Sequence, residues 1–153
     1  MASTLTVDNI VGATSSDKIH IPGHVVQVVF STLSSNYTNS TGSFTSTGLS
    51  ATITPSSSSS KIYVLLDGEG GQNTSGRSCF YRVMRGGATQ LTINDNLQTG
   101  PTSSAMPLTA TALDSPSTTS AITYTLEMRT DGVGTVSAAG SHRSRITLME
   151  IAQ

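Results

Sequence analysis

Short runs of alternating apolar and polar residues dominate this chain, and clusters of turn-forming residues separate them about every 8–12 residues. In residues 48–54 (GLSATIT), for example, Leu49, Ala51 and Ile53 alternate with Ser and Thr. No window of about a dozen residues has the apolar spacing of an amphipathic helix without Gly, Pro or Ser clusters. The pattern predicts an all-β chain of about eight to nine strands, folded as a single antiparallel β-sandwich or jelly roll.

Hydroxyl groups rather than charges supply the polar character of the chain. The 153 residues include 25 Ser and 24 Thr, whereas charged residues make up 11% and the formal net charge is −1. Such a neutral chain lacks the electrostatic footprint for binding a nucleic acid backbone. No apolar run approaches the ~18 residues of a membrane-spanning helix, and the first residues lack the pattern of a secretory signal peptide. We therefore expect neither nucleic acid binding nor membrane insertion.

The chain divides into an N-terminal extended arm, residues 1–23, and a sandwich head, residues 24–153. The arm holds a short alternating segment at 3–11 and ends at Pro22-Gly23. It is too short to form a core of its own, so it needs another surface to pair with. We expect it to attach the protein to a larger particle through its apolar residues: Leu5, Val7, Ile10 and Ile19.

The first strand of the head, residues 24–30, is apolar on both faces, which is typical of a strand covered from both sides. The head has few aromatic residues with which to build a core, since the chain contains three Phe, four Tyr and no Trp. Closed cyclic symmetry is the common way in which copies cover one another. We expect four valines of this strand to form the oligomer interface: Val25, Val26, Val28 and Val29.

Three long polar stretches, residues 31–46, 67–77 and 94–104, are predicted to be exposed loops that no core requires. Loops on a rigid sandwich are a usual place for recognition. Their aromatic faces and amide groups suit a neutral glycan on a host surface. The candidate contact residues are Tyr37, Phe44, Asn73, Arg77, Asn94, Asp95 and Asn96.

The sequence contains no recognisable catalytic or cofactor-binding constellation. Cys79 is a single cysteine inside a predicted strand, where a small core residue is expected. Asp67 and Glu69 lie in a glycine-rich segment without the spacing of a calcium loop. His20 and His24 flank Pro22-Gly23, and two interpretations stay open: a metal site on a threefold axis, or ordinary polar residues at the ends of a turn.

Two arginine-rich regions remain, and surface positions are the default for both. Arg82 and Arg85 lie on or beside one predicted strand, and further arginines gather near the C-terminus. Among these, Arg145 is close enough in sequence to Glu150 for the pair to bridge a neighbouring strand or a second subunit. We expect no catalytic residue, cofactor or resident metal.

Three blocks of the sequence resemble small structural proteins in the virions of marine tailed bacteriophages. These blocks contain MASTLTVDNIVGAT with IHIPGHVVQVV, TGLSATITPSSSSSKIYVLL, and SRITLMEI, and cover roughly residues 1–30, 47–66 and 121–153. The opening motif is also similar to the start of fibre-like phage proteins. The strand order resembles the jelly roll of tumour necrosis factor and complement C1q heads, which form threefold assemblies and bind through variable loops, so no functional residue is carried over.

The resemblance implies a non-enzymatic protein on the surface of a phage particle. The first hypothesis is a homotrimeric fibre or fibre tip, held to other virion proteins by the arm and contacting host glycan through its loops. The second is a capsid decoration protein that clamps the shell. A third, a secreted carbohydrate-binding module, predicts a signal peptide and an aromatic sugar platform, and the scarcity of aromatic residues argues against it.

Overall fold

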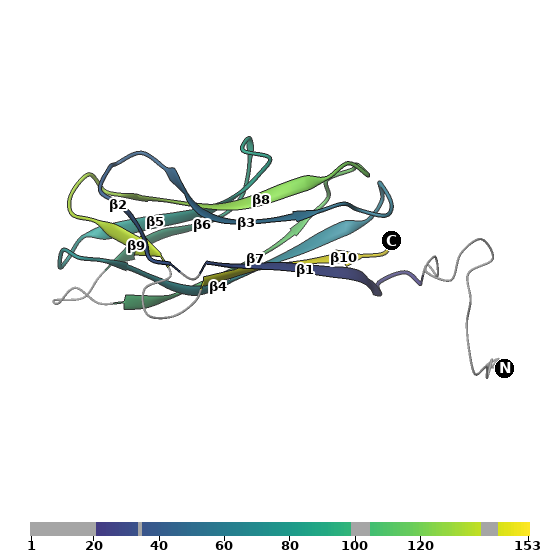
Figure 1. Cartoon of the computed structure of the whole chain (residues 1–153), viewed down its shortest axis with the longest axis horizontal. Coiled ribbons are helices and arrows are strands. Elements are labelled where there is room, and N and C mark those ends of the chain that lie inside the picture. The colour runs from purple at the N-terminus through teal and green to yellow at the C-terminus, as the bar shows by residue number, and fades with distance from the viewer. Residues whose placement is uncertain (1–20, 34, 99–104, 139–143) are drawn as a thin grey trace.

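The computed structural model describes residues 21–33, 35–98, 105–138 and 144–153, with side chains described except at 92–98, and it shows two stacked β-sheets (Figure 1). Sheet A contains β1 (Val25–Leu33), β2 (Tyr37–Asn39), β4 (Lys61–Gln72), β7 (Ala105–Asp114), β9 (Val136–Ala138) and β10 (Ser144–Ile151). Sheet B contains β3 (Thr45–Ile53), β5 (Ser78–Arg85), β6 (Thr89–Gln98) and β8 (Ile122–Thr130). The described residues include no helix long and apolar enough to span a membrane.

The strands form an antiparallel sandwich with the crossovers of a jelly roll, as the sequence predicted. In sheet A, β4 pairs with β7 on one side and with β10 and β9 on the other, and β1 and β2 form the far edge. Sheet B has the order β3-β8-β5-β6. The described strands number ten rather than eight or nine, because the three-residue strand β2 lies in a stretch that was predicted to be a loop.

The hydrophobic core lies between the two sheets and uses every second residue of the long strands. Along β8, Ile122, Tyr124, Leu126 and Met128 point inward, and the residues between them are half-buried. Cys79 is also buried in this core, as its place in the alternation predicted. The alternation read from the sequence therefore corresponds to the inner and outer faces of each sheet.

Two turns between strands have the geometry that their residues favour. Gly86 and Gly87 join β5 to β6 with φ angles of +57° and +70°, the left-handed values that a type I′ hairpin requires at both central positions. The serine run after Pro55 forms a turn rather than a linker, because the Ser60 N–H donates to the Ser57 carbonyl at 3.2 Å.

Three predicted loops are shorter than expected because strands extend into them. β1 continues to Leu33 and β2 occupies 37–39, so the stretch 31–46 is not one open loop. β4 runs on through Asp67-Gly68-Glu69 to Gln72, which leaves only 73–77 as a connection. β6 extends to Gln98, so residues 94–96 belong to a strand.

Two glycines in the extended part of β4, Gly68 and Gly70, are required by close packing. A Cβ atom on Gly68 would lie 2.6 Å from the Cα atom of Ser144, and one on Gly70 would lie 2.6 Å from Cζ of Tyr81. The Tyr81 hydroxyl needs this approach, because it donates to the Ser137 carbonyl at 2.6 Å and accepts from the Gly71 N–H at 2.9 Å. A glycine-rich segment that reads as a loop in the sequence is thus a strand on which other residues pack closely.

Gly68→Ala should destabilise the head by about 1–3 kcal/mol, since the added methyl group meets backbone that cannot move freely. The measurement is the free energy of unfolding in urea. Gly42→Ala is the matched control, because its Cβ would meet the nearest atoms only at 3.7 Å, an ordinary contact distance. Equal stability of the two variants would contradict the close packing at Gly68.

Candidate functional site

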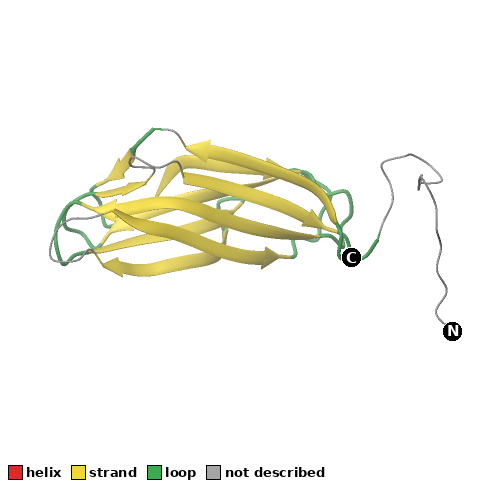
Figure 2. Cartoon of the chain, turned by 90° about the horizontal axis from the view of Figure 1, so that it is seen from below, coloured by secondary structure: helices red, strands yellow, loops and turns green. Residues whose placement is uncertain are grey.

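The outer face of sheet A, which Figure 2 shows from below, carries an unusually apolar surface. One row of cross-strand neighbours runs across four of its strands, β1, β10, β4 and β7, as Val28, Met149, Tyr63 and Leu113. The next row contains Phe30, Thr147, Leu65 and Thr111. Phe30, Leu113 and Val28 are 65%, 57% and 53% exposed. We call this surface the apolar face and define it by six residues: Val28, Phe30, Tyr63, Leu65, Leu113 and Met149.

Only part of the predicted valine interface lies on the outside of the head. Val25 and Val28 are exposed, but Val29 packs against the core and Val26 is half-buried. Val28 and Val29 differ because neighbouring residues of a strand point to opposite faces, and a register shift between Val25 and Gln27 interrupts this alternation so that Val25 is also exposed. The sequence shows that β1 is rich in apolar residues. It does not show that the apolar surface extends from β1 over β10, β4 and β7.

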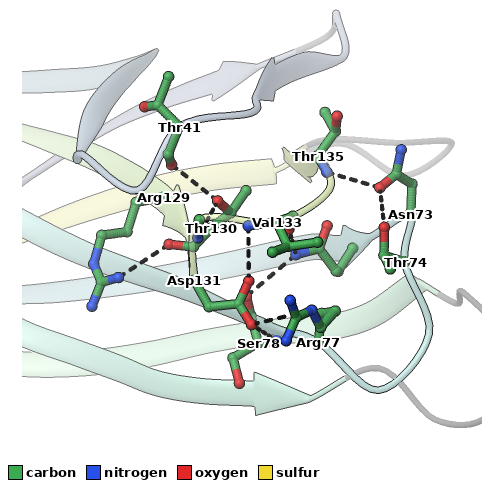
Figure 3. A network of polar contacts seen from close by, with 12 residues as sticks. Thr41, Asn73, Thr74, Arg77, Ser78, Arg129, Thr130, Asp131, Val133 and Thr135 are labelled. Atoms are coloured by element: carbon green, nitrogen blue, oxygen red, sulfur yellow. Dashed lines mark hydrogen bonds and ion pairs between the residues drawn. The ribbon is translucent and has the colours of Figure 1, made fainter.

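The end of the sandwich opposite to the start of β1 is formed by loops around residues 40–44, 73–77 and 131–135, and we call it the far end. Figure 3 shows how its loops are joined by polar contacts. The Thr41 carbonyl accepts from both the N–H and the hydroxyl of Thr130, at 3.0 and 3.1 Å. The Asn73 side-chain oxygen accepts from the Thr135 N–H at 2.8 Å, and the Asn73 N–H donates to the Thr135 carbonyl at 3.0 Å. These bonds fix neighbouring loops in one arrangement.

Asp131 organises the second half of this network. Its carboxylate accepts from the N–H groups of Ser78 and Val133 at 3.3 and 3.2 Å, and Arg77 lies 3.8 Å away. Desolvation acts to raise the pKa of Asp131, but the two N–H groups and the Arg77 guanidinium outweigh it and hold that pKa below its usual value. Two predicted contact residues, Asn73 and Arg77, therefore lie together at the far end and also take part in its internal structure.

A shallow hollow of about 380 Å³ lies beside Asn73, where the outer face of sheet A reaches the far end. Gly71 forms part of its floor, since it has no side chain, between its cross-strand neighbours Ser137 and Ala105. The described lining residues carry amides, hydroxyls or no polar side chain: Asn36, Thr38, Gly71, Gln72, Asn73, Ala105, Thr135 and Ser137. None of them titrates near neutral pH, so the hollow offers hydrogen bonds rather than acid–base chemistry.

The other predicted contact residues are not brought to this hollow. Tyr37 packs against the core, and its hydroxyl lies 3.5 Å from Oγ1 of Thr45. Phe44 is half-buried on the outer side of sheet B beneath two guanidinium groups. Asn94, Asp95 and Asn96 lie in β6, and their side chains are outside the described part of the chain. The prediction of one exposed loop at 94–104 is wrong for 94–98, because β6 pairs with β5 there.

Two of the described titratable side chains, Cys79 and Tyr124, are buried and have raised pKa values. Burial raises the pKa of Cys79 to about 11, so its thiol is protonated at neutral pH and is a poor nucleophile. Burial and the hydrogen bond to Asp114 raise the pKa of Tyr124. The described residues contain no group of three or more His, Cys, Asp or Glu side chains placed to hold a metal ion. The Nδ1 atom of His24 contacts the backbone of Ile21, and His20 lies outside the described residues.

Two carboxylates that sequence reasoning did not single out as buried connect separate parts of the head. Asp114, at the end of β7, accepts two hydrogen bonds from Arg85 at 2.8 and 2.9 Å and one from the Tyr124 hydroxyl at 2.7 Å. Glu150 is fully buried in β10 and faces inward, whereas Arg145 faces outward. Arg145 therefore has the surface position that was the default expectation, and it does not pair with Glu150 within one chain because the two residues point to opposite faces.

The arm residues Leu5, Val7, Ile10 and Ile19 lie outside the described part of the chain, so their role stays a prediction. No known family model matches the chain, and no curated protein matches it in sequence.

Proposed function

We propose that the protein is a non-enzymatic structural protein of a phage virion, a trimeric fibre or fibre tip that is attached by its arm and contacts host glycan. The apolar face carries this proposal. Contiguous exposed apolar side chains on one face of a small domain are typical of a surface through which proteins associate. A second and third copy of the chain are the proposed partners, since the domains that the sequence resembles assemble around a threefold axis.

The placement of the two ends of the head supports a role at the tip of an appendage. The chain enters the head beside its C-terminus, where the Gly23 N–H donates to the Ala152 carbonyl at 2.8 Å. The far end, with its fixed loops and polar hollow, lies at the other extreme of the sandwich (Figure 1). An arm at one end and hydrogen-bonding groups at the other suit a protein that links a particle to a glycan on the host surface. Repetition around a threefold axis would strengthen weak single contacts.

The first test is the molar mass of the full chain in solution at micromolar concentration, measured by size-exclusion chromatography with light scattering. We expect about three times the chain mass of 15.8 kDa. A molar mass of 15.8 kDa, that of one chain, would contradict the proposed trimer.

The second test locates the protein on virions that carry its gene, by mass spectrometry of purified particles and gold-labelled antibodies. Label at the tail or fibre tip supports the fibre hypothesis. Label spread in many copies over the shell would favour the capsid decoration hypothesis instead. Absence of the protein from purified particles would contradict both.

A further inference from the structure

The outer face of sheet B carries a cluster of alternating arginine and phenylalanine side chains. The guanidinium carbon of Arg129 lies 3.8 Å from the ring centroid of Phe80, its cross-strand neighbour, and 5.1 Å from that of Phe44. Arg82 contacts the same Phe44 ring at 4.1 Å. We call Phe44, Phe80, Arg82 and Arg129 the arginine–phenylalanine cluster. Guanidinium groups stacked on aromatic rings in this way are held in a fixed orientation.

The two arginines of the cluster differ in their charge partners. Arg82 is neutralised by Glu127, whose Oε2 atom lies 2.7 Å from Nη2 and 2.8 Å from Nε. Arg129 donates from Nη1 to the carbonyl of its neighbour Thr130 at 3.0 Å. No described carboxylate lies within 4.0 Å of the Arg129 guanidinium. A guanidinium has five N–H donors, so Arg129 presents a positive charge with hydrogen-bonding capacity that the described residues leave available.

This arrangement is suited to a planar or tetrahedral anionic group. Arginine recognises carboxylate and phosphate-like oxygens through two parallel hydrogen bonds, which are stronger than bonds between neutral groups. The flanking rings hold the Arg129 side chain in place, which lowers the entropy cost of ordering a long side chain when a ligand binds. Arg129, which is stacked on aromatic rings and has no described carboxylate partner, is therefore pre-organised to bind one acidic group.

Hydroxyl groups farther along the same face favour an extended saccharide as the carrier of that group. Towards the other end of the face, the outward positions of β3 and β8 carry hydroxyls, including Thr52 and Thr123, whose oxygens lie 2.8 Å apart. Hydroxyl groups can exchange hydrogen bonds with the hydroxyls of a saccharide. A nucleic acid would need several cations along its backbone, and the net charge of −1 offers no such footprint.

We propose that the arginine–phenylalanine cluster binds the carboxylate or sulfate groups of an acidic polysaccharide, with Arg129 as the anion-binding residue. This proposal rests on the host contact of the proposed function and gives it a chemical class. In an assembly that covers the apolar face of sheet A, the outer face of sheet B remains on the outside. The cluster lies near the far end, because Phe80 and Arg129 adjoin the last pair between β5 and β8, Cys79 and Thr130.

The proposal is tested by isothermal titration calorimetry of the full chain with three oligosaccharides of equal length. The probes are a polyuronate, a sulfated galactan and a neutral mannan. We expect at least one acidic probe to bind, more weakly at higher salt because the contact is ionic, and the acidic probe that binds identifies the anion. Absence of binding to both acidic probes, or equal binding of the neutral one, would overturn the proposal.

Three variants place the contact on the cluster. Arg129→Gln should weaken binding of the acidic probe about 10- to 100-fold, because it removes charge-assisted hydrogen bonds. Arg145→Gln is the matched control, because Arg145 is an exposed arginine of β10 in sheet A, away from the cluster on sheet B. Glu127→Gln should strengthen binding, because it releases Arg82. An equal loss of affinity in Arg129→Gln and in the control variant, or unchanged affinity in Arg129→Gln, would overturn the assignment of Arg129 as the anion-binding residue.

Molar mass and thermal unfolding of each variant show that the head stays folded and assembled. These measurements also separate the two proposals. A trimer found on virions that binds neither acidic probe would leave the proposed function standing and remove the acidic glycan. A monomer that binds an acidic probe through Arg129 would remove the proposed trimer and leave the acidic glycan site standing.

Discussion

Val28→Lys should convert the assembled protein into a monomer of 15.8 kDa while the sandwich remains folded. Val28 lies on the apolar face and is 53% exposed in the isolated chain, so a lysine there keeps its charge in water as long as the chain is alone. In an assembly that covers this face the same charge would be buried without a partner. The effective penalty for burying an unpaired ion is several kcal/mol, which is enough to abolish association at micromolar concentration.

The measurement is molar mass by light scattering, with circular dichroism to show that the fold is retained. Val133→Lys is the matched control, because Val133 is also an exposed valine, at 40%, but lies in a loop of the far end. Leu113→Lys tests the opposite end of the same row and should also give a monomer. If Val28→Lys and Leu113→Lys kept the mass of the unmodified protein, the apolar face would not be the interface.

Local features of the head could be predicted because neighbouring residues determine them. The Gly86-Gly87 hairpin needs only two adjacent residues that accept positive φ, and both have it. The inward positions of β8 follow from alternation within a single strand. Both follow from patterns shorter than about a dozen residues, as does the alternation that predicts the sandwich.

Features that depend on residues far apart in sequence could not be predicted in this way. The composition of β4 beyond Asp67 indicates a loop, yet the segment is a strand because Ser144 and Tyr81 pack against positions where only glycine fits. The apolar face combines residues from β1, β4, β7 and β10, whose order in the sheet the sequence does not state. Likewise, the sequence places Phe44 in a predicted loop, and only the fold brings it against Arg82 and Arg129.

The buried carboxylate of Glu150 shows the same dependence on distant residues and leads to the largest expected loss of stability in the head. Gln27 donates to Oε2 at 2.6 Å, and the N–H and hydroxyl of Ser56 donate to Oε1 at 2.8 and 2.6 Å. Glu150 thereby joins β1, β10 and the turn after β3 at the end of the sandwich where the chain enters. Glu150→Ala removes the common acceptor of these donors and should cost about 3 kcal/mol in the free energy of unfolding.

The same group should make the head sensitive to acid. Burial acts to raise the pKa of Glu150, but the hydrogen bonds from Gln27 and Ser56 outweigh it, so this pKa lies below its usual value. A carboxyl with a lower pKa in the folded state stabilises the fold fully above the unfolded pKa of about 4.3. That contribution is lost as the pH falls through the folded pKa, because the unfolded chain takes up the proton more readily.

Glu150→Gln separates the titration from the packing, because glutamine keeps the shape of the side chain and cannot ionise. We expect the variant to be less stable than the unmodified protein at pH 7 and to lose less stability between about pH 5 and pH 3. The measurement is the free energy of urea unfolding at several pH values. Asp131→Asn is the comparison at the far end, where the carboxylate is more exposed and also has a lowered pKa. Parallel pH profiles for Glu150→Gln and the unmodified protein would show that Glu150 does not bind its donors as a carboxylate.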